Sequence, residues 1–235
     1  VKEGDSIADL ILEAASKQDF TLADGDIVVV TSKIISKAEG RVVRLDDVEP
    51  SPGALRFSKF LDMDSRKVEV VLSEAKRIVR MVKGLIIAET RQGFVCANGG
   101  VDQSNVEPGL LALLPKNPDR SARRIVREIK RKAGVDVAVV VTDTFGRPWR
   151  EGQTNVAVGV AGLIPLRSYV GEKDAFGYEL KVTSMAVADE IASASELVMG
   201  KLERVPVAVV RGYRYEAGRG SARRLVRRVS RDLFR

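Results

Sequence analysis

The chain has 235 residues, of which 45% are hydrophobic and 30% charged, a composition typical of one compact unit with its own core. Its single cysteine, Cys96, excludes an internal disulfide and suits a reducing cytoplasm. It has no histidine, which excludes a Ser-His-Asp triad, a histidine general base and a zinc site with histidine ligands. Any catalysis therefore depends on carboxylates, lysine, arginine, hydroxyls, backbone amides or an oxygen-preferring metal ion.

The formal net charge of +7 favours a polyanionic partner, either nucleic acid or a phosphorylated small molecule. Part of this charge lies in the arginine-rich segment 220–235. No apolar run reaches the ~18 residues needed to cross a bilayer, and the start does not resemble a secretory signal, so no membrane partner is expected. Because the first residue is Val1 rather than methionine, we expect residues to precede it.

The first hundred residues alternate between helix and strand patterns without a fixed rhythm. Residues 4–16 predict an amphipathic helix that begins near Asp5 or Ser6. Residues 25–36 predict a strand that runs into a polar segment, and residues 36–43 predict a turn that leads to another strand. Residues 66–90 mix helix and strand signals, and residues 93–105 predict a short strand that ends in a glycine pair.

The second half begins with a clear helix over 121–134, with Ser121 as its cap and Gly134 just past its end. A buried strand follows at 135–144 and a second strand at 155–163. A helix rich in small residues begins at about Ala186, and a last strand lies at 205–212. Helices and strands mix without a regular βαβ pattern. An α+β fold is therefore expected rather than a doubly wound sheet, in one domain spanning 1–235.

The segment 220–235 predicts an amphipathic helix, from the spacing of its apolar residues Leu225, Val226, Val229, Leu233 and Phe234. We expect the apolar face to pack on the body of the protein. The arginines on the remaining faces offer the alternative, a surface that contacts the phosphates of a nucleic acid.

Three predicted strands end in clusters of small, hydroxyl and acidic residues. The run IVVV leads into residues 31–41, FVCA leads into 98–105, and VVVT leads into 143–147. Sheet proteins commonly place binding groups at such strand ends, on a rigid support. These three segments are therefore the candidate site.

The clusters suit the binding of a metal-bound polyphosphate. Asp102 and Asp143 offer carboxylates to a magnesium ion, and Thr144 offers a hydroxyl. Glycines 99–100 would let backbone amides approach phosphates, whose other candidate contacts are Lys37, Arg41 and Arg147. Turn chemistry explains each acid and the glycine pair equally well, and a surface ion pair explains the last arginine. No GxxxxGK[ST] motif is present, which disfavours a P-loop NTPase.

Five motifs in order, SKAEGR, CANGGVDQSN, TDTFGRPWREGQ, VADEIASASELVMGK and VPVAVVRG, resemble the coenzyme F420-0:L-glutamate ligase family. The resemblance runs from GDSIADLI to DLFR, essentially the whole chain. It implies a two-lobed α+β fold and an intertwined homodimer. The implied activity is GTP-dependent addition of L-glutamate, by gamma-linkage, to the deazaflavin F420-0 through an acyl phosphate. Implied cofactors are Mg²⁺ or Mn²⁺, with K⁺ as a further candidate.

The resemblance also assigns residues. It implies Asp102, Asp143 and Thr144 as metal ligands. Asp102, Asp143 and Lys37 would act in catalysis. The nucleotide contacts would be Ser32, Lys33, Lys37, Asn105 and the segment from Met199 to Val205, with Met199, Gly200 and Lys201 at its start.

Three features depart from the family pattern. Lys201 stands in MGKLERVP where some relatives carry an acidic metal ligand, in a loop that is a residue shorter, so we expect a phosphate contact or a solvated side chain there. Gln92 stands where relatives often have histidine, so an essential role is not expected. The family's Gly-Leu-Pro segment, which helps line the nucleotide pocket, would lie before Val1.

Two alternatives of other classes stay open. A magnesium-dependent phosphatase or nucleotide hydrolase would use the same carboxylates. A basic nucleic-acid-binding module would use the net charge, but only 5% of residues are aromatic and no nucleic-acid-binding motif is recognisable. The sequence leaves open the number of glutamates added, GTP against ATP, and the preferred metal.

Overall fold

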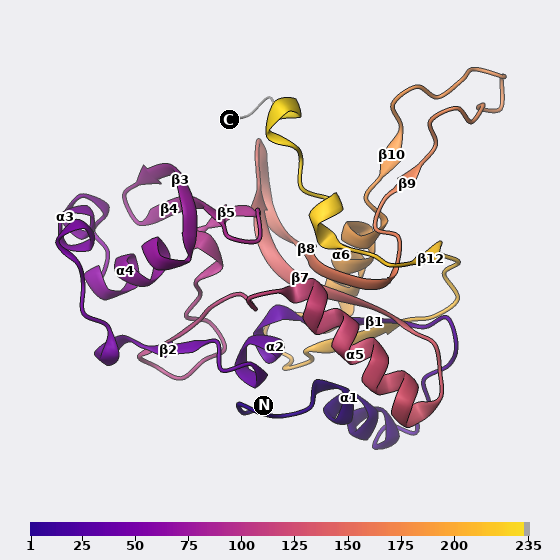
Figure 1. Ribbon diagram of the computed structural model, residues 1–235, viewed down its shortest axis with the longest axis horizontal. Helices are drawn as coiled ribbons and strands as arrows, with labels where there is room; N and C mark the ends of the chain where they lie inside the picture. Colours follow the sequence, from indigo (N-terminus) through magenta and orange to yellow (C-terminus); the bar gives the residue numbers. More distant parts are fainter. Residues whose placement is uncertain (233–235) are drawn as a thin grey trace.

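The computed structural model describes residues 1–232 and centres on a five-stranded sheet of order β11-β1-β7-β8-β12 (Figure 1). Its β1–β7 pair is parallel, and its other three pairs are antiparallel. This mixed sheet confirms the predicted α+β class. The strands are β11 (Val207–Val210), β1 (Ile27–Thr31), β7 (Ala138–Arg147), β8 (Arg150–Leu163) and β12 (Ala217–Gly218).

Helices cover both faces of this sheet, which explains why β1 and the first half of β7 are continuous apolar runs. In Figure 1, α5 crosses in front of β7 and β8, and α6 lies behind them. The shorter α1 packs against α5. The helices are α1 (Ile7–Ser16), α2 (Ser32–Ala38), α5 (Pro118–Ala133) and α6 (Val187–Met199).

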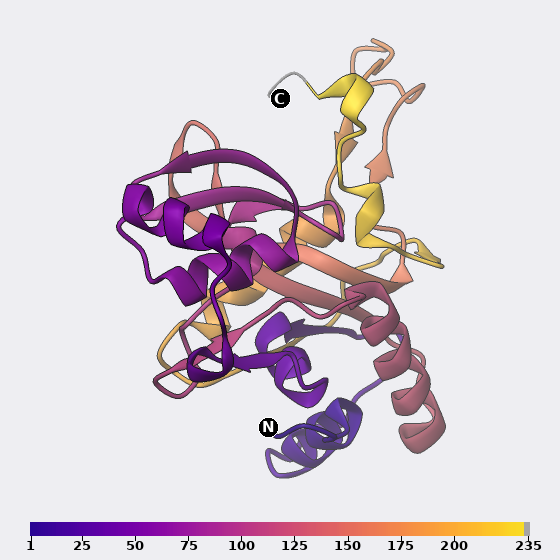
Figure 2. The ribbon, with the colours of Figure 1, turned by 60° about the vertical axis from the view of Figure 1, so that its left-hand side comes forward.

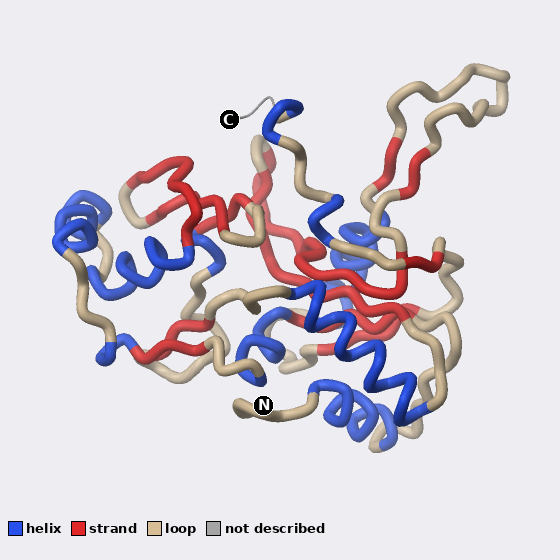
Figure 3. Tube along the Cα trace, viewed as in Figure 1, coloured by secondary structure: helices blue, strands red, loops and turns tan. Residues whose placement is uncertain are grey.

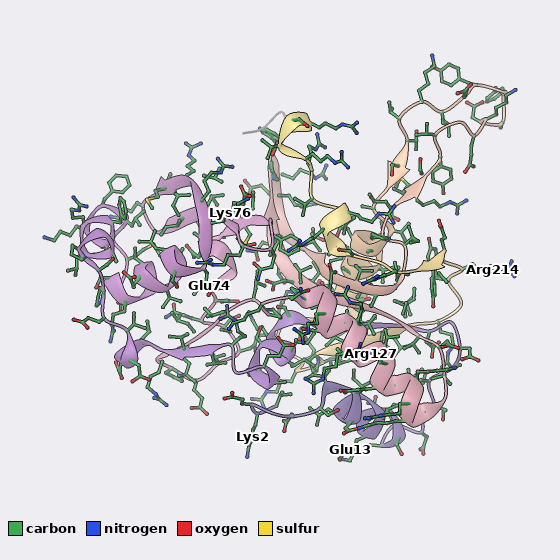
Figure 4. The ribbon with its side chains drawn as sticks, viewed as in Figure 1. Lys2, Glu13, Glu74, Lys76, Arg127 and Arg214 are labelled. Carbon is green, nitrogen blue, oxygen red and sulfur yellow. The ribbon has the colours of Figure 1, made fainter. Side chains whose placement is uncertain are left out.

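Residues 42–112 form a second unit between α2 and α5, with its own hydrophobic cluster (Figure 2). Glu74, labelled in Figure 4, lies on the side of this unit that faces the main sheet, where its carboxylate meets Arg41 Nη2 at 2.5 Å. The elements of the unit are β2 (Val42–Arg44), α3 (Pro52–Leu61), α4 (Ser65–Glu74), β3 (Ala75–Val82), β4 (Leu85–Thr90), β5 (Val95–Ala97) and β6 (Leu110–Ala112).

A hairpin arm projects from the body between β8 and α6. Figure 3 shows that it is mostly loop beyond two short strands, β9 (Arg167–Ser168) and β10 (Ser184–Met185). Phe176, in the loop of the arm, is 97% exposed. Within residues 1–232, none of the helices combines the length and the apolar character that crossing a bilayer requires.

Helix ends test the cap predictions directly. Ser6 caps α1 by accepting a hydrogen bond from the Asp9 amide, and Gly134 ends α5 with φ 78°, both as predicted. Ser121 is not a cap. Helix α5 begins three residues earlier, where Asn117 accepts from the Arg120 amide at 3.0 Å and Pro118 supplies the φ that the first turn needs.

Two predicted segments differ in the structure. Residues 32–38, predicted as a polar segment, form the helix α2 directly after β1. The predicted strand 135–144 corresponds to β7, which continues to Arg147, and the chain turns at Pro148 and Trp149. The predicted strand 155–163 likewise begins earlier, at Arg150.

The predicted C-terminal α-helix is wrong for the described residues. The chain there forms two separate single turns of 3₁₀ helix, Ala222–Arg224 and Val229–Arg231. Leu225 and Val226 do pack on the main core, whereas Val229 is 72% exposed. The other two apolar residues of the predicted face, Leu233 and Phe234, lie outside the described residues.

Candidate functional site

A pocket of about 950 Å³ opens where β1 and β7 end and where α6 gives way to its following loop. The strand end and the start of α2 bring hydroxyls and lysines to one side, and the loop after β5 brings Asp102 to the same opening. The ten residues that the resemblance assigns individually all line this pocket, namely Ser32, Lys33, Lys37, Asp102, Asn105, Asp143, Thr144, Met199, Gly200 and Lys201. In the rest of the assigned segment 199–205, Arg204 and Val205 line the pocket, whereas Leu202 and Glu203 do not.

Asp143 and Asp102 are the acidic centre of the pocket. Asp143 keeps part of its surface open to the pocket, yet burial among its neighbours is the main reason why its pKa is raised. Lys33 acts in the opposite direction, and the charge of Asp102 adds to the rise. The two carboxylates are therefore close enough to feel each other's charge.

Asp102 is held by its own loop. Its oxygens accept hydrogen bonds from the Ser104 amide at 2.9 Å and the Ser104 hydroxyl at 2.8 Å, and it forms an ion pair with Lys33. Burial raises the pKa of Asp102, but these partners together outweigh burial and hold the pKa below its usual range. Asp102 is thus ionised at neutral pH.

The glycine pair before Asp102 is explained by the turn. Gly99 and Gly100 have φ values of 58° and 76°, which side chains rarely adopt. A Cβ on Gly100 would also meet the Leu114 side chain at 2.6 Å. The pair therefore shapes the loop that carries Asp102, and no contact of the glycines with phosphate is needed to explain it.

Two lysines of α2 face the pocket mouth. Lys33 pairs with Asp102, and Lys37 Nζ donates to the Asn105 carbonyl at 2.6 Å. The other predicted basic contacts do not line the pocket. Arg41 bonds Glu74 and the Leu114 carbonyl, and Arg147 bonds the Glu151 carbonyl within the β7–β8 turn. Arg147 is exposed, but it donates to backbone carbonyls of the turn, so within residues 1–232 the surface ion pair predicted for it is not formed.

Thr144 lies on the other face of β7 from Asp143, because successive side chains of a strand alternate. Its hydroxyl donates to Asn155 Oδ1 at 2.7 Å and accepts from Lys201 Nζ at 2.9 Å. Lys201 Nζ also lies 3.2 Å from Asn155 Oδ1 and 3.3 Å from a carboxylate oxygen of Glu196. Sequence reasoning missed Asn155 and Glu196, since the first opens an apolar run and the second reads as a solvated helix residue.

Thr142 is a further pocket residue that sequence reasoning did not assign. Its hydroxyl oxygen is fully buried, and among the described residues it is the one buried side-chain oxygen or nitrogen without a hydrogen-bond partner. Buried hydroxyls are nearly always paired, so an unpaired one beside a pocket points to a ligand that pairs with it. The sequence signal that could have identified Thr142 is its spacing of two residues from Thr144, which places both side chains on the same face of β7.

The oxygen atoms of the pocket suit a hard divalent cation. Asp102 and Asp143 supply two carboxylates of the kind that magnesium and manganese prefer. Across residues 1–232, no three His, Cys, Asp or Glu side chains gather as metal ligands, so a metal held here would take its remaining ligands from hydroxyls, water and substrate. The Thr144 hydroxyl already has two partners.

Cys96 also lines the pocket but does not suit nucleophilic chemistry. Burial, and secondly the charge of Asp143, raise the pKa of its thiol to about 12. The thiolate, which is the reactive form, is therefore scarce at neutral pH.

Comparisons with known proteins agree on one family. The model of the family "F420-0:Gamma-glutamyl ligase" matches residues 1–212. The chain is 45% identical to the coenzyme F420:L-glutamate ligase of Methanothermobacter thermautotrophicus, over all of this chain and 94% of the relative. It is 45% identical to the protein of the same name from Methanopyrus kandleri, over all of this chain and 93% of that relative. The Methanocaldococcus jannaschii protein of that name is 46% identical, over 92% of this chain and 87% of its own length.

Proposed function

The chain belongs to the F420-0:gamma-glutamyl ligase family, and on that premise we propose that it joins L-glutamate to a coenzyme F420 precursor during synthesis of this coenzyme. The observation that supports this most is the gathering of all ten assigned residues around a single pocket. Four separate segments of the chain contribute them, so their meeting is a property of the fold. The volume of the pocket, about 950 Å³, is at the upper end of the usual range for small-molecule pockets.

We propose GTP as the phosphate donor and Mg²⁺ or Mn²⁺ as the metal, with K⁺ as a further ion. In the reaction, an oxygen of the lactyl carboxylate of F420-0 attacks the terminal phosphorus, and the bond to GDP breaks. The amine of L-glutamate then attacks the carbonyl carbon of this acyl phosphate, and the bond to phosphate breaks. The amine loses a proton to solvent as the amide forms, so that the products are the amide, GDP and phosphate, and GTP supplies the driving force.

The chain's own residues would oppose the repulsion between these anions. Lys33 and Lys37 can each donate further hydrogen bonds, because an ammonium group has three donors and each of the two lysines uses one, toward Asp102 and the Asn105 carbonyl respectively. Asp102 and Asp143 would hold a divalent ion, which when bound would screen the negative charge of the phosphates. Bringing phosphate and carboxylate into contact in a fixed orientation is where such a pocket lowers the barrier.

The resemblance also supports an intertwined homodimer, a two-lobed arrangement and a cytoplasmic location, which we propose on that ground. The two hydrophobic clusters of the chain, one around the main sheet and one within residues 42–112, are compatible with two lobes. The exposed arm is compatible with contacts to a second subunit.

The test is GTP turnover measured with and without F420-0 and L-glutamate, with the products weighed by mass spectrometry. Turnover that needs both substrates, with a product heavier by one or more glutamyl units, would support the ligase. Turnover without either substrate would support a metal-dependent hydrolase, and the absence of turnover under all conditions would contradict both. ATP in place of GTP tests the nucleotide, and the mass series gives the number of glutamates added.

A further inference from the structure

Lys201 brings a positive charge to the face of β7 opposite Asp143. Its ammonium group contacts three oxygen-bearing side chains, Thr144 on β7, Asn155 on β8 and Glu196 on α6, at 2.9, 3.2 and 3.3 Å. Strands β7 and β8 follow each other in the chain, and α6 comes more than twenty residues after β8. The side chain of Lys201 is still 54% exposed, so its charge also faces the pocket.

The hydrogen bonds around Lys201 have a fixed direction. An ammonium group has only donors, and the Thr144 hydroxyl gives its own hydrogen to Asn155 Oδ1 at 2.7 Å. The lone pairs of Thr144 therefore point at Lys201. A hydroxyl, an amide oxygen and a carboxylate are also the ligands that a hard metal ion prefers. The Lys201 ammonium lies within 3.3 Å of all three oxygens, so it stands where a metal ion bound to Thr144 would be.

The backbone explains why Lys201 reaches this position. Helix α6 ends at Gly200, with φ 59° and ψ −171°, a conformation open almost only to glycine. A Cβ at Gly200 would meet a Glu203 carboxylate oxygen at 2.0 Å. Met199, just before, is buried and fixes the helix end against the core. The sharp exit from the helix thus directs the next side chain back over Thr144.

The pocket therefore has two places for positive charge, one on each face of β7. On one face, Asp102, which is paired with Lys33, and Asp143 form the place for a divalent ion. On the other face, Lys201 already fills the place beside Thr144.

Resting on the proposed function, we infer that Lys201 is a tethered cation that replaces a metal ion at Thr144. This chain then holds its divalent ion at Asp102 and Asp143 alone. Lys201 neutralises the other end of the bound phosphate chain. Because the tethered charge cannot dissociate, that part of the site does not depend on the metal concentration.

The first test counts bound Mn²⁺ by the loss of the free-ion signal in electron paramagnetic resonance, with the metal alone as probe. Lys201→Glu places a fourth oxygen-bearing side chain beside Thr144, Asn155 and Glu196. We expect it to bind one more Mn²⁺ per chain than the wild type. Lys116→Gln removes an exposed lysine elsewhere and should match the wild type. Equal Mn²⁺ numbers in Lys201→Glu and wild type would overturn the inference.

The second test measures GTP affinity by calorimetry at saturating magnesium. Lys201→Gln should lower the affinity about tenfold, because it removes one charge-assisted contact with a polyanion. Lys201→Glu should regain affinity as Mn²⁺ is raised. Weaker GTP binding in Lys201→Gln without the additional Mn²⁺ in Lys201→Glu would also overturn the inference, since Lys201 would then be an ordinary phosphate contact. Because Mn²⁺ counting needs no substrate, it remains readable even if ligation is never observed.

Discussion

Arg211 forms a bidentate ion pair with the buried carboxylate of Asp26, with Nε 2.8 Å from Oδ1 and Nη2 2.7 Å from Oδ2. Asp26 immediately precedes β1 and Arg211 immediately follows β11, so the pair closes one end of this antiparallel strand pair. Asp26 also accepts from the Ala23 amide, and Arg211 stacks on the Phe20 ring at 4.6 Å. The ion pair thus belongs to the frame that supports the pocket rather than to the pocket itself.

Asp26→Asn should lower the free energy of unfolding by about 1.5–3 kcal/mol, the usual contribution of hydrogen bonds to a charged group. Arg211 holds the pKa of Asp26 below its usual range, so the pair stabilises the fold above the unfolded pKa of about 3.9. That stability is lost as the pH falls through the lower, folded pKa. Urea titrations of wild type and variant should therefore differ at pH 7 and converge in acid.

The control for Asp26→Asn is Asp62→Asn, which removes an ion pair with Lys83 whose two side chains are 72% and 78% exposed. Exposed pairs contribute little, so this variant should stay within about 0.5 kcal/mol of wild type. Equal losses in the two variants would contradict a special role for the buried pair.

Asp143→Asn should abolish ligation while leaving the fold intact. A neutral amide is a poor ligand for a hard cation, so metal and phosphate affinity should both fall. Burial raises the pKa of Asp143, which means that its charged form destabilises the metal-free fold. The metal-free variant should therefore unfold at the wild-type temperature or above it. Wild-type turnover at saturating metal would contradict the assignment.

If Lys37 contacts the nucleotide phosphates as proposed, Lys37→Ala should weaken GTP binding about tenfold and leave F420-0 binding nearly unchanged. Calorimetric titration with each substrate separates the two effects, and Lys116→Ala serves as the exposed control. Unchanged GTP affinity would return Lys37 to the role of a turn contact with the Asn105 carbonyl.

Thr142→Val tests the unpaired hydroxyl. The change keeps the shape of the side chain and removes a buried group without a partner, so stability should stay equal or rise slightly. If a ligand pairs with this hydroxyl, GTP or acceptor affinity should fall by about fivefold, the equivalent of one ordinary hydrogen bond. Thr142→Ser keeps the hydroxyl and should retain the affinity. Identical affinities in all three proteins would place the ligand elsewhere.

Deleting residues 221–235 should lower the melting temperature. Ser221 Oγ and the Ala222 amide both donate to the buried carboxylate of Asp119, and Leu225 and Val226 pack on the main core. Each apolar side chain of this kind contributes roughly 1.5–3 kcal/mol when fully buried, and these two are partly buried. Any RNA affinity of the intact protein should be weak and disappear with salt. Salt-resistant RNA binding lost on deletion, with stability unchanged, would revive the nucleic-acid-binding module.

Local chemistry made part of the fold predictable. The cap at Ser6 and the stop at Gly134 were both predicted because each depends on its own few residues. Helix α2 was missed because its seven residues make barely two turns, too few for a period to show. In the C-terminal segment, contacts between Asp119 and residues 221–222 prevailed over helical spacing, and no local pattern reveals such a distant partner.

The site divides in the same way. The strand ends marked Asp102, Asp143 and Thr144 because strand and polar cluster are adjacent in the sequence. Asn155 and Glu196 were missed because their approach to Lys201 depends on the pairing of β7 with β8 and on where α6 ends. The sequence did not distinguish a phosphate-binding role of glycines 99–100 from a turn. The lack of room for a Cβ beside Leu114, which favours the turn, depends on a residue outside the local sequence.

The long pairing of β7 with β8 has a consequence for how this pocket can change. The register runs from Val139 opposite Ala161 to Arg147 opposite Arg150, with an irregularity between Val141 and Thr142. A shift of one residue along a strand sends every side chain to the other face. Deleting one residue of β7 before Asp143 would thus aim the carboxylate at Lys201 and the hydroxyl at Lys33. A point substitution changes one side chain of this pocket, but inserting or deleting one residue in β7 would exchange the side chains on the two faces of the strand.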